Sequence, residues 1–89
     1  MPRFYFDLRD DNGIAPDEEG LELSGLRAVQ GEAAKSVADM ARDAIIAAPA
    51  TGGRQKMAID VRDDKGPVMR VTFAFALETF TPGSPPADH

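Results

Sequence analysis

The 89-residue sequence contains no cysteine, no tryptophan and a single histidine, His89, which is its last residue. Without cysteine the chain has no disulfides, no thiolate metal ligands and no cysteine nucleophile. A histidine in a proline-rich terminal segment is not held in place to activate a serine. The sequence therefore predicts neither catalytic residues nor metal ligands, and we expect no enzymatic activity and no cofactor.

Long apolar runs are also missing. The first 13 residues, MPRFYFDLRDDNG, mix apolar with charged residues, whereas a secretion signal needs an unbroken apolar core. No stretch approaches the roughly 18 apolar residues that cross a bilayer. We therefore expect a cytoplasmic protein that has no membrane contact.

Positive charge is scarce, with 10 basic against 15 acidic residues and a net charge of -5. Residues 1–23 hold seven acids and two bases, whereas residues 24–89 hold eight of each. The sequence shows no basic stripe, so we expect no binding to nucleic acid. A protein partner with a basic patch would instead meet an acidic rim, although a solvated acidic surface is the simpler interpretation. This acidic rim comprises Asp10, Asp11, Asp17, Glu18 and Glu19.

One long amphipathic helix is expected over residues 26–48, where apolar residues recur every three or four positions. Ser24 is placed to cap the start of this helix, and Pro49 ends it. Beyond Met40 the helix is apolar nearly all round, more than one core-facing stripe requires. The candidate contact between two copies in a homodimer is formed at this end by Ala41, Ile45, Ile46 and Ala48.

Four strands are expected, two on each side of the helix. Residues 3–9 and 68–77 alternate apolar with polar or small residues, which is typical of half-buried strands. Residues 55–62 form the third strand. The return strand of the first hairpin, residues 14–16, is weak, because Pro16 lacks a donor and belongs at a sheet edge. Turns rich in aspartate and glycine close both hairpins.

These elements predict an α+β fold with ββαββ connectivity: a four-stranded antiparallel sheet in the order 2-1-3-4, with one long helix packed on one face. Residues 1–80 form this domain, and residues 81–89 a flexible proline-rich tail. The helix should overhang strands of six or seven residues. Substitution of Phe6 by alanine should cost about 3–5 kcal/mol. The expected core comprises Phe4, Phe6, Leu8, Leu26, Val29, Ala33, Val37, Met40, Ala44, Met57, Ile59, Val61, Met69, Val71 and Phe73.

The two hairpins are similar in sequence. FDLRDDNG at residues 6–13 aligns with IDVRDDKG at residues 59–66, with five identities in eight positions. Duplication and convergence on the same turn chemistry both explain this similarity. If the first and third strands are adjacent, Asp7 and Asp60 form a carboxylate pair, although both belong to the polar face where solvated carboxylates are expected.

The first turn also has part of the spacing of a calcium-binding loop. Asp10, Asn12 and Glu19 fall on three of its ligand positions. The position of the leading carboxylate holds Leu8, and a strand stands where an entering helix should be. We therefore interpret this match as accidental.

The sequence RFYF at residues 3–6 and the sequence DEEG at residues 17–20, followed by an alanine-rich helix, resemble a known family. It comprises short alphaproteobacterial proteins of unknown function that begin with a Pro-Arg-aromatic-aromatic-Phe strand. The resemblance implies a shared fold and carries no activity and no site residues. The layout also resembles that of HicB-type antitoxins, which pair an Asp-Gly hairpin with an alanine-rich helix.

The function expected from these patterns is that of a small, non-catalytic protein-binding or regulatory module. A self-associating structural protein without a ligand is the alternative. An acidic-loop metal-binding protein or an enzyme is a further alternative, for which the candidate residues are those of the first turn and the Asp7–Asp60 pair.

Overall fold

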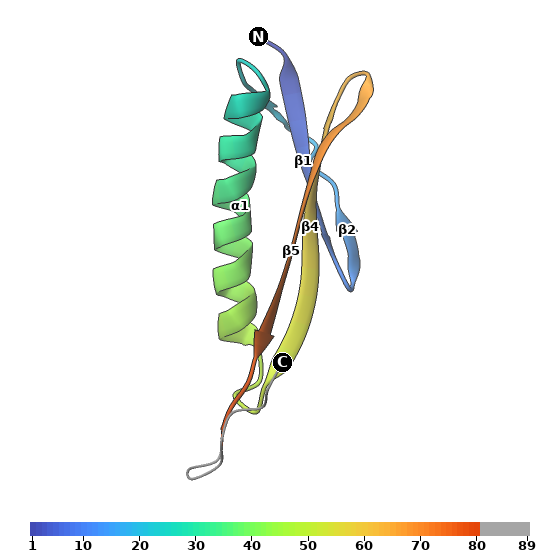
Figure 1. Cartoon of the computed structure of the whole chain (residues 1–89). Coiled ribbons are helices and arrows are strands. Elements are labelled where there is room, and N and C mark those ends of the chain that lie inside the picture. Colours follow the sequence, from blue (N-terminus) through green and yellow to red (C-terminus); the bar gives the residue numbers. More distant parts are fainter. Residues whose placement is uncertain (81–89) are drawn as a thin grey trace.

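In the computed structural model, which describes residues 1–80, one helix packs on one face of an antiparallel sheet (Figure 1). The elements are β1 (Arg3–Asp10), β2 (Gly13–Ala15), β3 (Leu21–Glu22), α1 (Leu26–Ala47), β4 (Gly53–Asp63) and β5 (Gly66–Leu77). The predicted α+β class, with one helix on one face of an antiparallel sheet, is confirmed. The tail predicted at residues 81–89 lies outside the described residues.

The sheet has five strands, ordered β2-β1-β4-β5, and β3 pairs with β1 off that path. The predicted four-stranded sheet in the order 2-1-3-4 is therefore wrong, because a second short segment also pairs with β1. β2 pairs with the end of β1 near Leu8, and β3 pairs with its beginning at Arg3 and Phe4. The chain leaves the edge between them at Pro16, which has no N–H to donate. A two-residue strand has no periodicity, so β3 could not be found from the pattern.

The strands β4 and β5 are longer than expected. β4 has 11 residues and β5 has 12, against the shorter segments predicted from alternation. A strand of 11 residues spans about 36 Å and a helix of 22 residues about 33 Å. The predicted overhang of α1 beyond its sheet is therefore wrong for β4 and β5.

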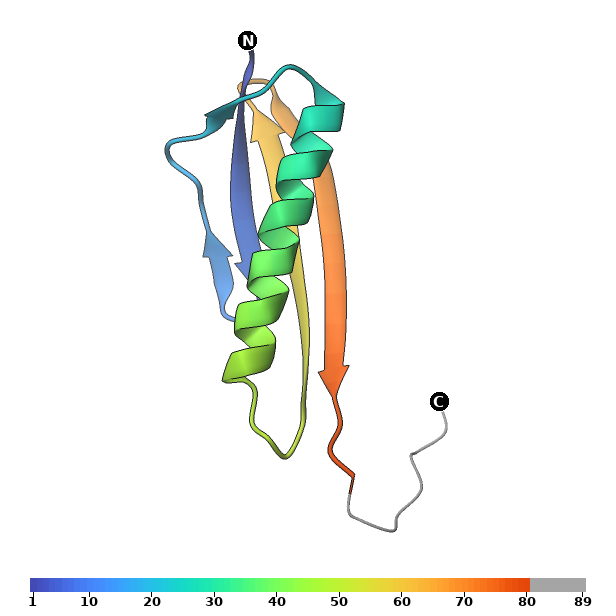
Figure 2. The same cartoon turned by 90° about the vertical axis from the view of Figure 1, so that its left-hand side faces the viewer.

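α1 crosses the sheet obliquely, from β5 at its start toward β1 and β2 at its end (Figure 2). Its start differs from the prediction, since Gly25 is the N-cap and no side chain caps the helix. Leu26, expected in the core, is 57% exposed at the first helical position, and the core begins one turn later at Val29. The buried apolar residues are Phe4, Val29, Ala33, Met57, Ala58, Ile59 and Val61. Phe6, Leu8, Val37, Met40 and Met69, also expected in the core, pack against this cluster and are partly buried.

Candidate functional site

The sheet face opposite α1 is covered by no other element among residues 1–80 (Figure 1). Side chains alternate between the two faces along each strand, and residues directly opposite each other on neighbouring strands share a face. Asp7 lies opposite Asp60, and Asp60 lies opposite Arg70. We call this surface the open face. On β1, β3, β4 and β5 it comprises Arg3, Tyr5, Asp7, Arg9, Glu22, Arg54, Lys56, Ala58, Asp60, Arg62, Arg70, Thr72, Ala74 and Ala76.

The open face is basic although the chain is acidic. It carries six of the chain's 10 basic residues and three of its 15 acidic residues, which gives this face a formal charge of +3. The absence of a basic stripe, expected from the sequence, does not hold for this face. These cations form no continuous stripe in the sequence, because they stand at alternate positions of three strands. Only the sheet register brings them together on one face. That the protein binds no nucleic acid stays a prediction.

Asp60 lies at the centre of the open face between two arginines. The Nε and Nη2 atoms of Arg9 donate to its Oδ2 at 3.1 and 3.0 Å, and Arg70 donates to both carboxylate oxygens from the other side. The hydrogen bond from Arg70, followed by the one from Arg9, holds the pKa of Asp60 below its usual range. Asp60 is therefore ionised at neutral pH and is not a proton donor.

Asp7 is the neighbour of Asp60 across the β1–β4 pair, and it has its own arginine. The Nε of Arg62 donates to Asp7 Oδ2 at 2.8 Å, while the guanidinium lies over the ring of Tyr5, 4.6 Å from its centroid. Sequence reasoning thus brought the right two carboxylates together. Because a separate arginine pairs with each carboxylate, Asp7 and Asp60 belong to one ion-pair network across β1 and β4.

The loop between β2 and β3 closes the edge of β1 through Asp17. Its Oδ2 accepts the backbone N–H of Phe6 at 3.2 Å, where neither short strand reaches β1. Its Oδ1 accepts the N–H groups of Glu19 and Gly20 at 3.1 and 3.2 Å. Its own N–H donates to Asp7 Oδ1 at 2.9 Å. The Asp17 carboxylate therefore accepts the hydrogen bond that a neighbouring strand would otherwise accept from Phe6. It also stabilises the turn of its own loop.

The environment of Asp17 combines opposing effects on its pKa. Burial is the largest and acts to raise the pKa, whereas the N–H donors of Gly20, Phe6 and Glu19 and the charge of Arg62 lower it. The donors prevail, and the pKa of Asp17 lies below its usual range. This carboxylate is ionised and committed to the fold at neutral pH.

The acidic rim predicted from the sequence does not form one cluster of available carboxylates. Asp17 is used as described, and Asp10 accepts the N–H of Asn12 at 2.8 Å in the first turn. Asp11, Glu18 and Glu19 have exposed side chains. Among residues 1–80 no group of three or more His, Cys, Asp or Glu residues is arranged to hold a metal ion. Contact of the rim with a partner stays a prediction.

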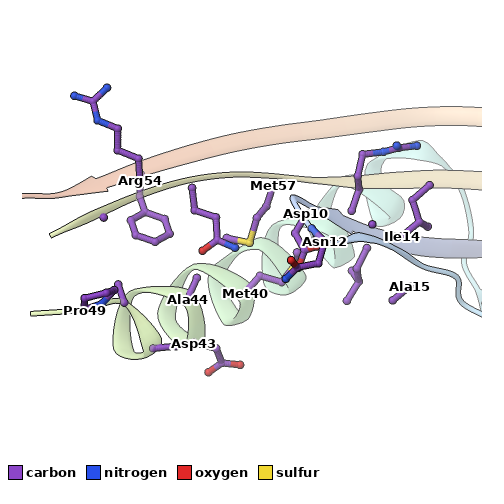
Figure 3. Close-up of a pocket in the computed structure, with 18 residues that line it drawn as sticks. Asp10, Asn12, Ile14, Ala15, Met40, Asp43, Ala44, Pro49, Arg54 and Met57 are labelled. Atoms are coloured by element: carbon purple, nitrogen blue, oxygen red, sulfur yellow. Dashed lines mark hydrogen bonds between the residues drawn. The ribbon is translucent and has the colours of Figure 1, made fainter.

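A groove with a volume of about 730 Å³ lies between the C-terminal half of α1 and the sheet beside the first hairpin. Met40 and Ala44 from the helix face Met57 from β4, and Asp10 and Ile14 approach from the hairpin (Figure 3). Among residues 1–80, those that line it include no His, Ser, Thr, Tyr, Cys or Lys. The groove can accept an apolar group, and its described lining supplies no hydroxyl, thiol, amine or imidazole nucleophile. Sequence reasoning missed this groove, whose only signal was the surplus of apolar residues after Met40.

The residues predicted for a homodimer contact lie at the end of α1 and are unequally exposed. Ile46 is 76% exposed and Ile45 is 43% exposed, so neither lies squarely on the core. Ala41 and Ala48 are partly buried. The structure therefore leaves apolar surface where the sequence predicted it, and the dimer itself stays a prediction.

A family model described as a domain of unknown function, DUF6894, matches residues 3–74. The chain belongs to the DUF6894 family. No curated protein and no solved structure matches the chain. The resemblance to a family of unknown function is thus confirmed, whereas the likeness to HicB-type antitoxins stays a prediction. Within residues 1–80, α1 is not apolar enough to span a membrane.

The DUF6894 match spans both hairpins and α1, including the two segments that carried the resemblance. These segments, RFYF and DEEG, touch each other in the structure. Arg3 Nη1 donates to the carbonyl of Glu19 at 2.7 Å, and Phe6 N–H donates to Asp17. A Cβ atom on Gly20 would lie 2.8 Å from the ring of Tyr5. The two segments form one structural unit at the edge of the sheet.

Proposed function

We propose that this protein is a non-catalytic binding module that recognises an acidic segment of a protein partner on its open face. The observation that carries the proposal is the charge of +3 on an uncovered sheet face of an otherwise acidic chain. Such a face attracts negative charge, while the remaining acidic surface disfavours other orientations. A cytoplasmic location belongs to the same proposal, because a cysteine-free chain suits a reducing compartment.

Two of the cations are available to a partner. Carboxylates hold the other four cations, Arg3, Arg9, Arg62 and Arg70. Arg54 and Lys56 form no ion pair with another residue in the described range 1–80. Both residues line a shallow hollow of about 530 Å³ on this part of the sheet, together with the small side chains of Ala74 and Ala76 and with Asp11 from the first turn. A second hollow of about 240 Å³ shares Asp11 and Lys56 with the first. It is also lined by Arg9, Asp10, Met57, Ala58, Arg70 and Thr72. Small side chains between cations leave room for an extended acidic chain.

A protein partner fits this surface better than nucleic acid does. Sheets that bind single-stranded nucleic acid stack bases on exposed aromatic rings. Tyr5 is the one aromatic residue of the open face, and the guanidinium of Arg62 already covers its ring. The acidic rim is a second surface for a protein partner, of opposite charge, and the test below separates the two.

Self-association without a further ligand is the alternative function. Exposure of Ile45 and Ile46 at the end of α1 favours it. The two functions are compatible, because the open face and the apolar end of the helix lie on opposite sides of the sheet (Figure 1).

The proposal is tested by fluorescence anisotropy with two labelled probes, a glutamate-rich peptide and a single-stranded oligonucleotide, at low and high salt. We expect the wild type to bind the peptide and to lose it as salt screens the charges. The double variant Arg54→Glu, Lys56→Glu should lose this binding. The double variant Arg27→Glu, Lys35→Glu changes the net charge equally on α1 and should keep it. Peptide binding that survives in the first variant overturns the proposal, as does binding of the oligonucleotide alone.

A partner captured from the native cell extract should be retained by the wild type and by Arg27→Glu, Lys35→Glu, and should be lost in Arg54→Glu, Lys56→Glu. The contact would instead lie on the acidic rim if the double variant Glu18→Lys, Glu19→Lys loses the partner. In that case the double variant Arg54→Glu, Lys56→Glu should still retain it.

A further inference from the structure

β5 forms an edge of the sheet, and within residues 1–80 it pairs only with β4. It is 12 residues long, so one side of its backbone presents a row of N–H and C=O groups without strand partners. A long edge of this kind is a template for a further strand. Its only charged residue is Arg70, and its only proline, Pro67, stands at the second position. β5 thus has one charge and one proline over 12 residues, few of the features that usually keep sheet edges apart, and residues 71–77 have neither.

The opposite edge of the sheet is protected. β2 and β3 have three and two residues, and the chain leaves the edge between them at Pro16. Asp17 occupies the gap by accepting the N–H of Phe6. This contrast indicates that any further strand would join at β5 and not at β2.

The apolar side of the sheet remains partly exposed toward the β5 edge. Val71, Phe73 and Phe75 alternate along β5 on the face that α1 covers, and all are only partly buried. The helix crosses away from this half of β5 (Figure 2). An apolar strip therefore borders the unpaired backbone edge.

The helix adds Ile45 to this strip. Asp43 and Ala47 line the groove on the β1–β2 side. Because successive helical residues are turned by about 100°, Ile45 lies on the opposite flank of α1, which is the β5 side. Ile46, at 76% exposure, points away from the sheet. The two neighbouring isoleucines therefore have different surroundings, which allows them to be tested against each other.

We propose that two copies of this chain pair along β5, antiparallel, around a two-fold axis perpendicular to the sheet. Two identical antiparallel edges are self-complementary, so a single contact closes the assembly. The product is one continuous sheet with both helices on the same face. Because the protected β2 edges lie at its two ends, the assembly stops at two copies.

The dimensions fit this arrangement. α1 packs over β4 and β5. With neighbouring strands about 4.8 Å apart, the two helices lie about 10 Å apart across the axis, close to the 8–10 Å of packed helices. A contact strip about 35 Å long and about 15 Å wide buries about 1,000 Å² over both copies, which reaches the size of a specific interface.

The charges also fit. An antiparallel register centred on Thr72 places Arg70 opposite Ala74 of the second copy, and one centred on Phe73 places it opposite Ala76. In neither register do the two arginines face each other. The acidic first hairpins lie at the far ends of the dimer, so their repulsion is small.

Sedimentation equilibrium on wild type, Ile45→Glu and Ile46→Glu tests the proposal. We expect the wild type to reach twice the monomer mass of 9.5 kDa in the micromolar range. Ile45→Glu should weaken the dimer at least about tenfold, because a charge is desolvated at the interface, whereas Ile46→Glu should leave it unchanged. Circular dichroism checks that both variants are folded. A wild type that remains a monomer at high micromolar concentration overturns the proposal.

Cross-linking locates the contact independently of the helix. Because the chain has no cysteine, single variants Thr72→Cys and Ala74→Cys and their mixture report on β5 alone. Oxidation should link two copies in one of these samples, since opposite residues on paired strands have Cβ atoms about 4.5–5.5 Å apart. Lys56→Cys, one strand further in on the same face, should stay unlinked. A dimer that links through residue 56, or through neither β5 position, contradicts pairing along β5.

Discussion

The two hairpins begin alike and end differently. Both turns use an aspartate that accepts the N–H two residues on, Asp10 from Asn12 and Asp63 from Lys65, each at 2.8 Å. Both turns end at a glycine with positive φ, Gly13 at 132° and Gly66 at 138°. Yet the first hairpin continues into a three-residue strand and the second into a 12-residue strand. The same turn chemistry thus starts a hairpin without deciding how far its strands pair.

The related segments also pair with each other. β1 and β4 run antiparallel with Asp7 opposite Asp60, so that Arg9 reaches Asp60 while Arg62 reaches Asp7. This reciprocity is local two-fold symmetry between the segments FDLR and IDVR. It breaks outside them, because Asp60 gains Arg70 from the long strand β5. The first hairpin instead has Asp17, a loop residue, in place of strand residues.

The largest expected loss of stability comes from truncating a core residue, and the two hairpins contribute unequally to the core. Ile59 in β4 is fully buried, whereas Phe6, its counterpart in the aligned first segment, is only partly buried. Ile59→Ala should cost about 2–5 kcal/mol, and Phe6→Ala about 1–3 kcal/mol, less than its sequence position suggested. Urea unfolding followed by circular dichroism measures both. Equal losses would show that the first hairpin holds as much of the core as the second.

Removal of the Asp17 carboxylate, which closes the edge of β1, should have the next largest effect on stability. Asp17→Ala leaves the N–H of Phe6, Glu19 and Gly20 without their acceptor. Because the hydrogen bonds from Phe6 and Gly20 are partly buried, we expect a loss of about 1–3 kcal/mol. Glu18→Ala, an exposed neighbour, should change stability by less than about 0.5 kcal/mol. Hydrogen exchange should also show faster exchange of the Phe6 amide in the Asp17 variant, and an unchanged rate would contradict the role given to this loop.

Substitution of Gly20, in the same loop, should have a smaller effect on stability. Its φ is 72°, and an added Cβ would meet Tyr5 and Arg3 at 2.8 and 2.9 Å. Gly13 also has positive φ, but nothing lies within 4 Å of its Cβ position. Gly20→Ala should therefore cost about 1–2 kcal/mol, and Gly13→Ala about 1 kcal/mol. Thermal unfolding that ranks them in the opposite order would mean that Tyr5 and Arg3 move away at no cost.

The elements that were predictable have local signals. Alternation along β1 and β5, the three-to-four-residue spacing in α1 and the Asp-Gly turns each indicate their structure within a few residues. β3 has no such signal, because Leu21–Glu22 is a strand only by virtue of its pairing with β1. The burial of Leu26 was mispredicted for the same reason, since periodicity does not show where a helix leaves its sheet.

The open face shows the same limit for function. Arg9, Lys56 and Arg70 look like ordinary polar-face residues in their own strands, and only the register places them together. The DEEG segment was visible as a motif, but its role needed the contact between Asp17 and Phe6. A pattern along the chain thus finds elements, whereas a site made of several strands requires their pairing.

The smallest predicted effect concerns the ion pairs that link the two hairpins, and it appears as a pH dependence. The pKa of Asp60 is lowered in the folded protein by Arg70 and then by Arg9. Protonation therefore favours the unfolded chain: the stabilisation is complete above the ordinary pKa of 3.8 and is lost as pH falls through the lower folded pKa. Because the arginines are solvent-exposed, this contribution is about 0–1 kcal/mol.

Urea unfolding of wild type and Asp60→Asn between pH 6 and pH 2.5 measures this contribution. The free energy of unfolding of the wild type should fall more steeply below about pH 4 than that of the variant, and high salt should reduce the difference. Asp17→Asn should flatten the same acid limb, since the pKa of Asp17 is also lowered in the fold. The double variant Asp17→Asn, Asp60→Asn should show the two effects adding, because the carboxylates share no hydrogen-bond donor. If Asp60→Asn keeps the wild-type slope, the reciprocal ion pairs do not stabilise the junction of the hairpins.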